Sequence, residues 1–144
     1  MRPGVAILAL DDDGFVYLVR EFRYALGRQS IEVVSGTIDK GEASLSAARR
    51  ELHEELGIKA QEFVELGRLD PITSVLDAPT YLFLARGLEF GKKSPDGAEQ
   101  IETLKFRLAD ALRMVDSNEI THAQSCALIC MASRWLSAPA ENCR

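Results

Sequence analysis

The chain has 144 residues, 47% of them hydrophobic, and a formal net charge of −5 at pH 7. This length and composition predict a single domain over residues 1–144 with enough apolar side chains to bury a sizeable core. The acidic balance argues against a nucleic-acid polymer or an anionic membrane as partner, because phosphate-rich surfaces select basic proteins.

The sequence contains no recognisable signal for export or for membrane insertion. The N-terminus lacks the basic region, apolar run and small-residue cleavage site of a signal peptide, and no apolar run approaches the length of a membrane span. The three cysteines are an odd number without CxxC spacing. Cys126 and Cys130 lie four apart in a helical pattern and are expected to be buried free thiols. We therefore expect a cytoplasmic protein.

The first predicted elements are an apolar strand at 4–10 and an alternating strand at 15–20. The Asp-Asp-Asp-Gly segment at 11–14 favours a short hairpin turn over a calcium loop, which would need a later glutamate. Three arginines precede a third strand at 31–35, namely Arg20, Arg23 and Arg28. They are either solvated surface charge or, for one or two of them, ligands of a substrate phosphate or carboxylate through paired hydrogen bonds.

A helix with two different faces is predicted within residues 36–58. Turning about 100° per residue places an apolar stripe on one arc and three carboxylates on its flank. The stripe comprises Leu45, Ala48, Leu52 and Leu56, and the flank Glu51, Glu54 and Glu55. Hard oxygen ligands of this kind suit Mg²⁺ or Mn²⁺ better than Zn²⁺. A solvated acidic helix face is the alternative reading of the same pattern.

The spacing of the flanking residues resembles the Nudix box, the signature of the Nudix hydrolases. The matching positions are Gly36, Glu42, Arg50, Glu51, Leu52, Glu54, Glu55, Gly57 and Ile58. The resemblance implies that Glu51, Glu54 and Glu55, with the backbone carbonyl of Ser35, bind Mg²⁺, for which Mn²⁺ could substitute. It implies catalytic roles for Glu54 and Glu55. It also implies structural roles for Gly36, Gly57 and a pair formed by Glu42 and Arg50; by local pattern, Gly57 suits a helix stop.

The segment VREFRYALGRQSIEVVSGTIDKGE resembles more narrowly the ADP-ribose pyrophosphatase branch of that family. By this resemblance Arg23 and Glu32 contact the substrate, and we take Arg28 from the same arginine cluster as a third candidate. The chain departs from the branch in carrying Val34-Ser35 where Pro-Ala commonly precedes the box glycine. Members of the branch usually have several tens of residues before the first core strand, so we expect a differently built pocket or a dimer formed through another face.

Beyond the box, the pattern predicts strands at 62–69, 80–88 and 101–107, with loops at 70–79 and 91–100. Comparable enzymes carry a catalytic glutamate just before the last strand, which implies Glu99, or failing it Asp96 or Glu102. An amphipathic helix from Leu108 and a broadly apolar helix at 123–136 follow, the latter with a capping-box pattern at Thr121 and Gln124.

The fold class implied is an α/β Nudix fold, a mixed sheet between helices, with the box helix on one face and the C-terminal helix on the other. The resemblance implies metal-dependent hydrolysis of the diphosphate bond of a nucleoside diphosphate sugar, ADP-ribose first, by a homodimer. Hydrolysis of damaged nucleoside triphosphates or dinucleoside polyphosphates is one alternative. A non-catalytic domain that senses a nucleotide sugar is another.

Overall fold

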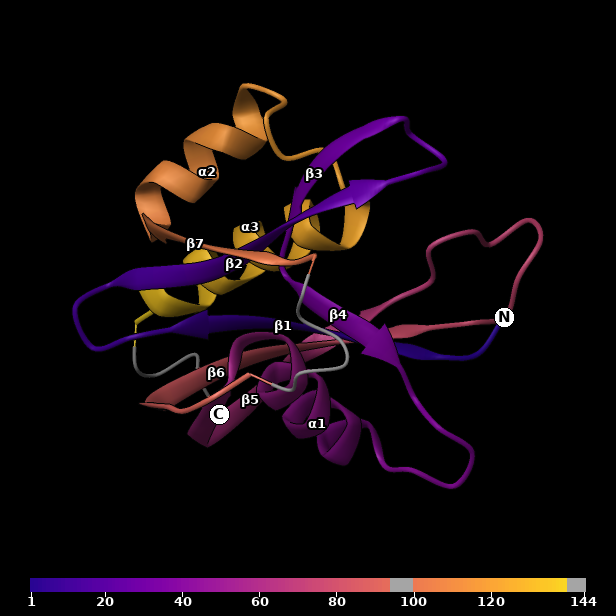
Figure 1. Ribbon diagram of the computed structural model, residues 1–144, viewed down its shortest axis with the longest axis horizontal. Coiled ribbons are helices and arrows are strands. Elements are labelled where there is room, and N and C mark those ends of the chain that lie inside the picture. The colour runs from indigo at the N-terminus through magenta and orange to yellow at the C-terminus, as the bar shows by residue number, and fades with distance from the viewer. Residues whose placement is uncertain (94–99, 140–144) are drawn as a thin grey trace.

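The computed structural model describes residues 1–93 and 100–139 (Figure 1). The elements occur in the predicted order and type, except that two strands replace the single strand predicted at 31–35. They are β1 (Gly4–Leu10), β2 (Phe15–Arg23), β3 (Arg28–Glu32), β4 (Val34–Thr37), α1 (Ser44–Leu56), β5 (Ile58–Leu69), β6 (Thr80–Phe90), β7 (Glu102–Arg107), α2 (Leu108–Asp116) and α3 (Ala123–Ser137). Within the described residues, no helix is both long and apolar enough to cross a lipid bilayer.

Strand β1 is the centre of a mixed sheet. It pairs in parallel with β6 along one edge and antiparallel with β4 and β2 along the other. Beyond β6 the sheet ends in β5, and β2 also pairs antiparallel with β7. Because both of its edges are paired and both of its faces are covered, β1 is apolar throughout, as its sequence predicts.

The strand predicted at 31–35 is in fact two strands with different partners. Strand β3 pairs with the far half of β2, and β4 pairs with the first half of β1, with only Val33 between them. Strands β1 and β2 are joined at their hairpin end by the pairs Ala9–Tyr17 and Leu10–Val16, and segment 28–37 fills the gap where they diverge. Arg28 and the start of the box at Gly36 therefore lie on one continuous segment.

Helices cover both faces of the sheet, with α1 on one side and α2 with α3 on the other (Figure 1). Alternate residues of β1 divide between the two cores: Val5, Ile7 and Ala9 pack towards α1, while Ala6 and Leu8 pack towards α3. The predicted α/β/α sandwich is therefore confirmed. It leaves the outer flank of α1 and the far end of the β2–β3 hairpin outside the core.

Three local predictions are wrong. Leu45 is 38% exposed, and Ala47 takes its place in the core, where its small side chain lets the first turn of α1 approach the sheet closely. Residue His122, not Thr121, is the N-cap of α3, and no side-chain hydrogen bond caps that helix. Cys126 and Cys130 are free thiols, but Cys130 is exposed because it lies on the outer side of α3.

Candidate active site

Arg50 ties the loop between β4 and α1 to the helix. Its guanidinium donates to both carboxylate oxygens of Glu42, from Nε and from Nη2, at 3.0 Å each. Nη2 also donates to the carbonyl oxygen of Thr37 at 2.9 Å, and Glu42 accepts the backbone N–H of Asp39 at 2.9 Å. The hydrogen bonds from Arg50 and Asp39 lower the pKa of Glu42. The predicted pair of Glu42 and Arg50 is confirmed.

The carboxylate of Glu51 lies directly against Gly36. A Cβ atom added to Gly36 would stand 2.0 Å from Cδ of Glu51, so only glycine leaves room for the carboxylate there. Arg50 donates from Nη1 to Glu51 at 2.7 Å and reaches Glu54 at 3.4 Å. Burial raises the pKa of Glu51, although Arg50 opposes the shift. The Arg50 guanidinium thus balances the negative charge of two of the three box carboxylates, Glu51 and Glu54.

Glu55 lies among other acids. Burial raises its pKa to about 8, and the charges of Glu51, Glu21 and Glu32 add to the shift while Arg23 opposes it. Glu21 and Glu32 come from β2 and β3, so carboxylates of the helix face carboxylates of the hairpin. A surplus of buried negative charge of this kind requires protons or cations to hold it together.

Arg23 of β2 binds Glu32 of β3 through two hydrogen bonds. Its Nε donates to Oε1 at 3.0 Å and its Nη2 to Oε2 at 2.6 Å, and Nη2 also lies 3.3 Å from Oε2 of Glu21. The Glu32 side chain is only 3% exposed. Burial alone would raise the pKa of Glu32, but the hydrogen bonds from Arg23 and Ser30 and the charges of His122 and Arg23 together outweigh it, and the pKa is lowered. Glu32 therefore remains a carboxylate and fixes the direction of Arg23.

His122, at the start of α3, stands behind this pair. Its Nδ1 lies 3.8 Å from Oε2 of Glu32 and 2.7 Å from the hydroxyl of Ser125. The fully buried Ser125 also accepts the backbone N–H of Val33, so α3 is joined to the break between β3 and β4. Burial lowers the pKa of His122, although Glu32 opposes the shift.

Sequence reasoning missed Glu21, His122 and Ser125. For Glu21 a signal existed: it lies two residues before Arg23, and alternate residues of a strand share a face. The observed pairing of Glu21 with Ser30 across the hairpin places Glu32 on that same face. For His122 and Ser125 the sequence held no signal, since about ninety residues separate them from Glu32 and Val33.

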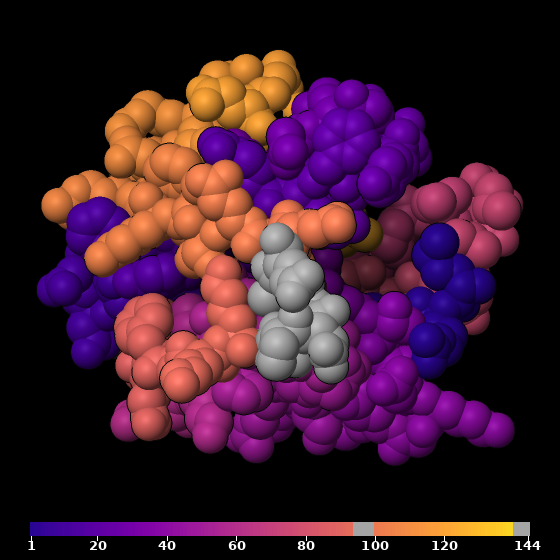
Figure 2. All heavy atoms as spheres, viewed as in Figure 1, coloured from indigo at the N-terminus to yellow at the C-terminus, as the bar shows by residue number. Residues whose placement is uncertain are grey.

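A cavity of about 420 Å³ opens beside Glu32. In Figure 2 the β2–β3 hairpin and the loop at 70–79 stand on either side of a hollow. Side chains from the hairpin, that loop and the start of α3 line it, namely Leu26, Ser30, Glu32, Pro71, Ile72, Thr121, His122, Ala123 and Gln124. The loop predicted at 70–79 therefore borders the arginine-bearing hairpin.

The remaining candidates lie elsewhere or outside the described residues. Arg28, opposite Arg23 at the end of the hairpin, donates to the hydroxyl of Thr121 at 3.1 Å. Ser35 lies within β4, next to Gly36. Glu102 pairs with Arg20 at 3.0 Å across β7 and β2. The described residues do not include Glu99 or Asp96.

The donor set of the site fits a hard divalent cation. Among residues 1–93 and 100–139, no three His, Cys, Asp or Glu side chains stand together as they would around a bound ion. Glu51 and Glu54 instead turn towards Arg50. The oxygen-only ligands, the room that Gly36 leaves and the raised pKa of Glu55 nonetheless match what a hard divalent cation requires.

Comparisons with known proteins agree with this architecture. The NUDIX domain model matches residues 1–126. The chain is 34% identical to an ADP-ribose pyrophosphatase of Bacillus subtilis (strain 168), over 86% of this chain and 69% of that one. It is 34% identical to an ADP-ribose pyrophosphatase of Mycobacterium tuberculosis, over 83% of this chain and 59% of that one. A crystal structure of an ADP compounds hydrolase superposes with a TM-score of 0.83 at 23% identity, over all of this chain and 78% of the other.

Proposed function

The chain belongs to the Nudix family of hydrolases, and we propose that it hydrolyses the diphosphate bond of a nucleoside diphosphate sugar, with ADP-ribose as the first candidate. Water adds to one phosphorus, the bridging P–O bond breaks, and a nucleoside monophosphate and a sugar phosphate leave. The observation that carries the proposal is the meeting of helix and hairpin carboxylates around Glu55, beside a fixed arginine and an open cavity. The names of the two similar pyrophosphatases support the choice of substrate.

We propose Mg²⁺ as the metal, with Mn²⁺ as a substitute. Glu51, Glu54 and Glu55, with the backbone carbonyl of Ser35, would hold it. A divalent ion supplies positive charge for the phosphoryl oxygens and lowers the pKa of a bound water. Gly36 would keep the carboxylate of Glu51 close to the backbone, and Arg50 would keep the loop of the box in place.

Arg23 is proposed to orient the substrate. Its Nε and Nη2 are held by Glu32, and its Nη1 makes no hydrogen bond to any residue that the structure describes. A guanidinium fixed on one side presents its remaining donors in a set direction, which suits a phosphate or carboxylate oxygen. Arg28, at the same end of the hairpin, would add a second positive charge.

The group that activates water remains a proposal from the sequence. We keep Glu99 as the first choice and Asp96 or Glu102 as the others. Of these, Glu102 is exposed and already paired with Arg20, so using it would require that ion pair to open. Its position at the start of β7 puts it next to the segment that carries the other two.

A homodimer in the cytoplasm completes the proposal. Large apolar side chains are exposed on the hairpin and on the loop at 70–79, namely Phe22, Tyr24, Leu26, Ile72 and Val75. A second copy that covered them would also border the cavity beside Glu32. The free thiols of Cys126 and Cys130 fit a reducing compartment. We also propose that residues 1–144 act as one domain.

A substrate panel tests the proposal. The protein is incubated with Mg²⁺ or Mn²⁺ and with ADP-ribose, other nucleoside diphosphate sugars, dinucleoside polyphosphates and nucleoside triphosphates, and products are resolved by chromatography. We expect AMP from ADP-ribose at the highest kcat/KM. Faster release of pyrophosphate from triphosphates would show that nucleoside triphosphates, and not nucleoside diphosphate sugars, are the preferred substrates. Binding of ADP-ribose without turnover of any compound would favour a sensor.

A further inference from the structure

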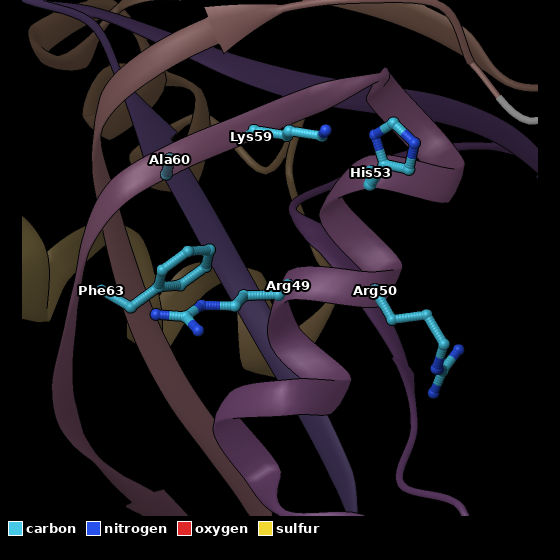
Figure 3. Close-up of a pocket in the computed structure, with 6 residues that line it drawn as sticks. All are labelled: Arg49, Arg50, His53, Lys59, Ala60 and Phe63. Atoms are coloured by element: carbon cyan, nitrogen blue, oxygen red, sulfur yellow. The ribbon is translucent and has the colours of Figure 1, made fainter.

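A second groove lies on the outer flank of α1, between that helix and β5. Its cavity has a volume of about 390 Å³, within the range of small-molecule pockets. It is lined by Arg49, Arg50, His53, Lys59, Ala60 and Phe63 (Figure 3). None of these residues except Arg50 belongs to the active site described above. We call this surface the α1–β5 groove.

The side chains of the groove converge from two elements. In Figure 3, Arg49 extends from the helix to the ring of Phe63, and the amino group of Lys59 points from the strand towards His53. The Cζ atom of Arg49 lies 5.6 Å from the centroid of the Phe63 ring. Arg50 points the opposite way, where it binds Glu42. The groove therefore offers the cations of Arg49 and Lys59 over an apolar floor.

These cations lack acidic partners. Within the described residues, neither Arg49 nor Lys59 takes part in an ion pair, although the chain as a whole has a net charge of −5. Positive charge gathered over apolar surface in an acidic protein is complementary to an anion with a flat apolar body. The floor that such a body would contact is formed by Phe63 and Ala60.

A neighbouring cavity of about 340 Å³ extends the groove and shares His53 and Lys59 with it. It reaches Lys92 and Phe90, a residue that is 58% exposed, and it also includes Glu89. Glu89 is the cross-strand partner of Lys59 and makes this end less favourable for a negative charge. An anionic group would therefore sit on the side of Lys59 that faces Arg49, away from Glu89.

We propose that the α1–β5 groove binds a phosphorylated compound with a flat aromatic body, of the nucleoside monophosphate class. Its phosphate lies between Arg49 and Lys59, and its base lies against Phe63 and Ala60. Two cationic donors satisfy a phosphate, and an aromatic floor contributes stacking that a bare anion could not use. Binding here does not depend on the proposed reaction. A nucleoside monophosphate is also a product of that reaction, and only this link between the groove and the enzyme rests on the proposed function.

The test measures binding without metal, so that hydrolysis and metal-linked binding play no part. AMP, ribose 5-phosphate, adenosine and inorganic phosphate are titrated in EDTA into the ¹⁵N-labelled full chain, and the amide shifts are mapped. We expect AMP to shift the amides of Arg49, Lys59 and Phe63 in a saturable way. Arg49→Gln and Lys59→Gln should each weaken AMP binding about tenfold, because each removes a charge-assisted hydrogen bond.

Two control variants test whether AMP binds in the groove or elsewhere on the protein. Lys40→Gln removes an exposed cation of the box loop, outside the lining of the groove, and Arg23→Gln removes the arginine of the hairpin; both should leave the groove shifts unchanged. Shifts confined to the hairpin and abolished by Arg23→Gln, or no saturable shift at all, would overturn the proposal. Equal affinity for inorganic phosphate and AMP would overturn the aromatic part of it. Unchanged thermal unfolding of Arg49→Gln and Lys59→Gln shows that they are folded.

Discussion

Two arginines of the candidate active site bind carboxylates in the same way but in different surroundings. The Arg50 cluster consists of Arg50 with Glu42, Glu51 and Glu54, all within α1 and the loop before it. The Arg23 cluster consists of Arg23 with Glu21, Glu32 and His122, drawn from two strands and a distant helix. Each arginine makes two hydrogen bonds to one glutamate at 2.6–3.0 Å.

Burial and sequence separation distinguish the clusters. Glu42 lies eight residues from Arg50 and its side chain is 17% exposed, whereas the side chain of Glu32 is 3% exposed and has His122 behind it. The Arg50 cluster is local and partly exposed to solvent, so it can form once the helix forms. A buried cluster assembled from distant segments needs the whole fold, and its partners are costly to separate. Glu55 lies where the two clusters meet.

The largest effect is expected from the box carboxylates at that meeting point. Glu54→Gln and Glu55→Gln should each lower kcat about a thousandfold or more, because a neutral amide replaces a proposed metal ligand. Without metal, Glu55→Gln should not lower the unfolding temperature, since it removes an acid from among acids. Steady-state kinetics with Mg²⁺ and calorimetry check both. Near-normal rates in both variants would contradict the assignment of Glu54 and Glu55 as metal ligands.

Metal removal should reveal the charge surplus around Glu55. Its pKa is about 8 in the folded chain, against about 4.5 for an ordinary glutamate, so between these pH values the folded state holds a proton that the unfolded state does not. Stability of the metal-free protein should therefore fall by a few kcal/mol as pH rises from 5 to 8. Mg²⁺ should cancel much of this fall in denaturant titrations. A pH-independent stability in EDTA would contradict the placement of Glu55.

Gly36→Ala tests the contact between β4 and the Arg50 cluster. The added Cβ would displace the carboxylate of Glu51, which is the far end of a flexible side chain, so the fold should survive. We expect kcat to fall about a hundredfold because a proposed metal ligand moves. Ser35→Ala, one residue earlier, keeps the backbone carbonyl and should retain activity. Equal rates for the two variants would mean that the position of Glu51 is not critical.

The smallest expected effect separates the two arginines directly. Arg23→Gln should reduce the free energy of unfolding by about 2 kcal/mol, because it leaves the buried carboxylate of Glu32 without its partner. Arg50→Gln should cost less, since water reaches Glu42. Urea unfolding of the two variants measures the difference, and Arg23→Gln/Glu32→Gln should recover part of the loss. A larger loss for Arg50→Gln would reverse the comparison.

The box was predictable because its parts are close in sequence. Periodicity placed Glu51, Glu54 and Glu55 on one flank, and the spacing of Glu42 and Arg50 predicted their pair. The order of strands and helices followed from apolar patterning in the same way. The partner change at Val33 was not predictable, because a continuous strand pattern does not say which neighbour each half will pair with.

The Arg23 cluster was only half predictable. The pattern and the family resemblance identified Arg23 and Glu32, but the support from His122 and Ser125 depends on where α3 docks. The α1–β5 groove was missed for a related reason. Arg49 and His53 come from α1, but the floor of the groove comes from β5, and the helical pattern does not show which strand lies beside it.

The central position of β1 has a consequence for synthesis on the ribosome. Of the strands β1 to β7 this one is made first, but its parallel partner β6 begins only at Thr80, so one edge of an apolar strand stays unpaired until some seventy more residues have emerged. Segment 28–37 can cover the other edge much sooner. A nascent chain stalled before β6 would therefore expose a ready template for aggregation, and chaperone binding should be strongest in that interval.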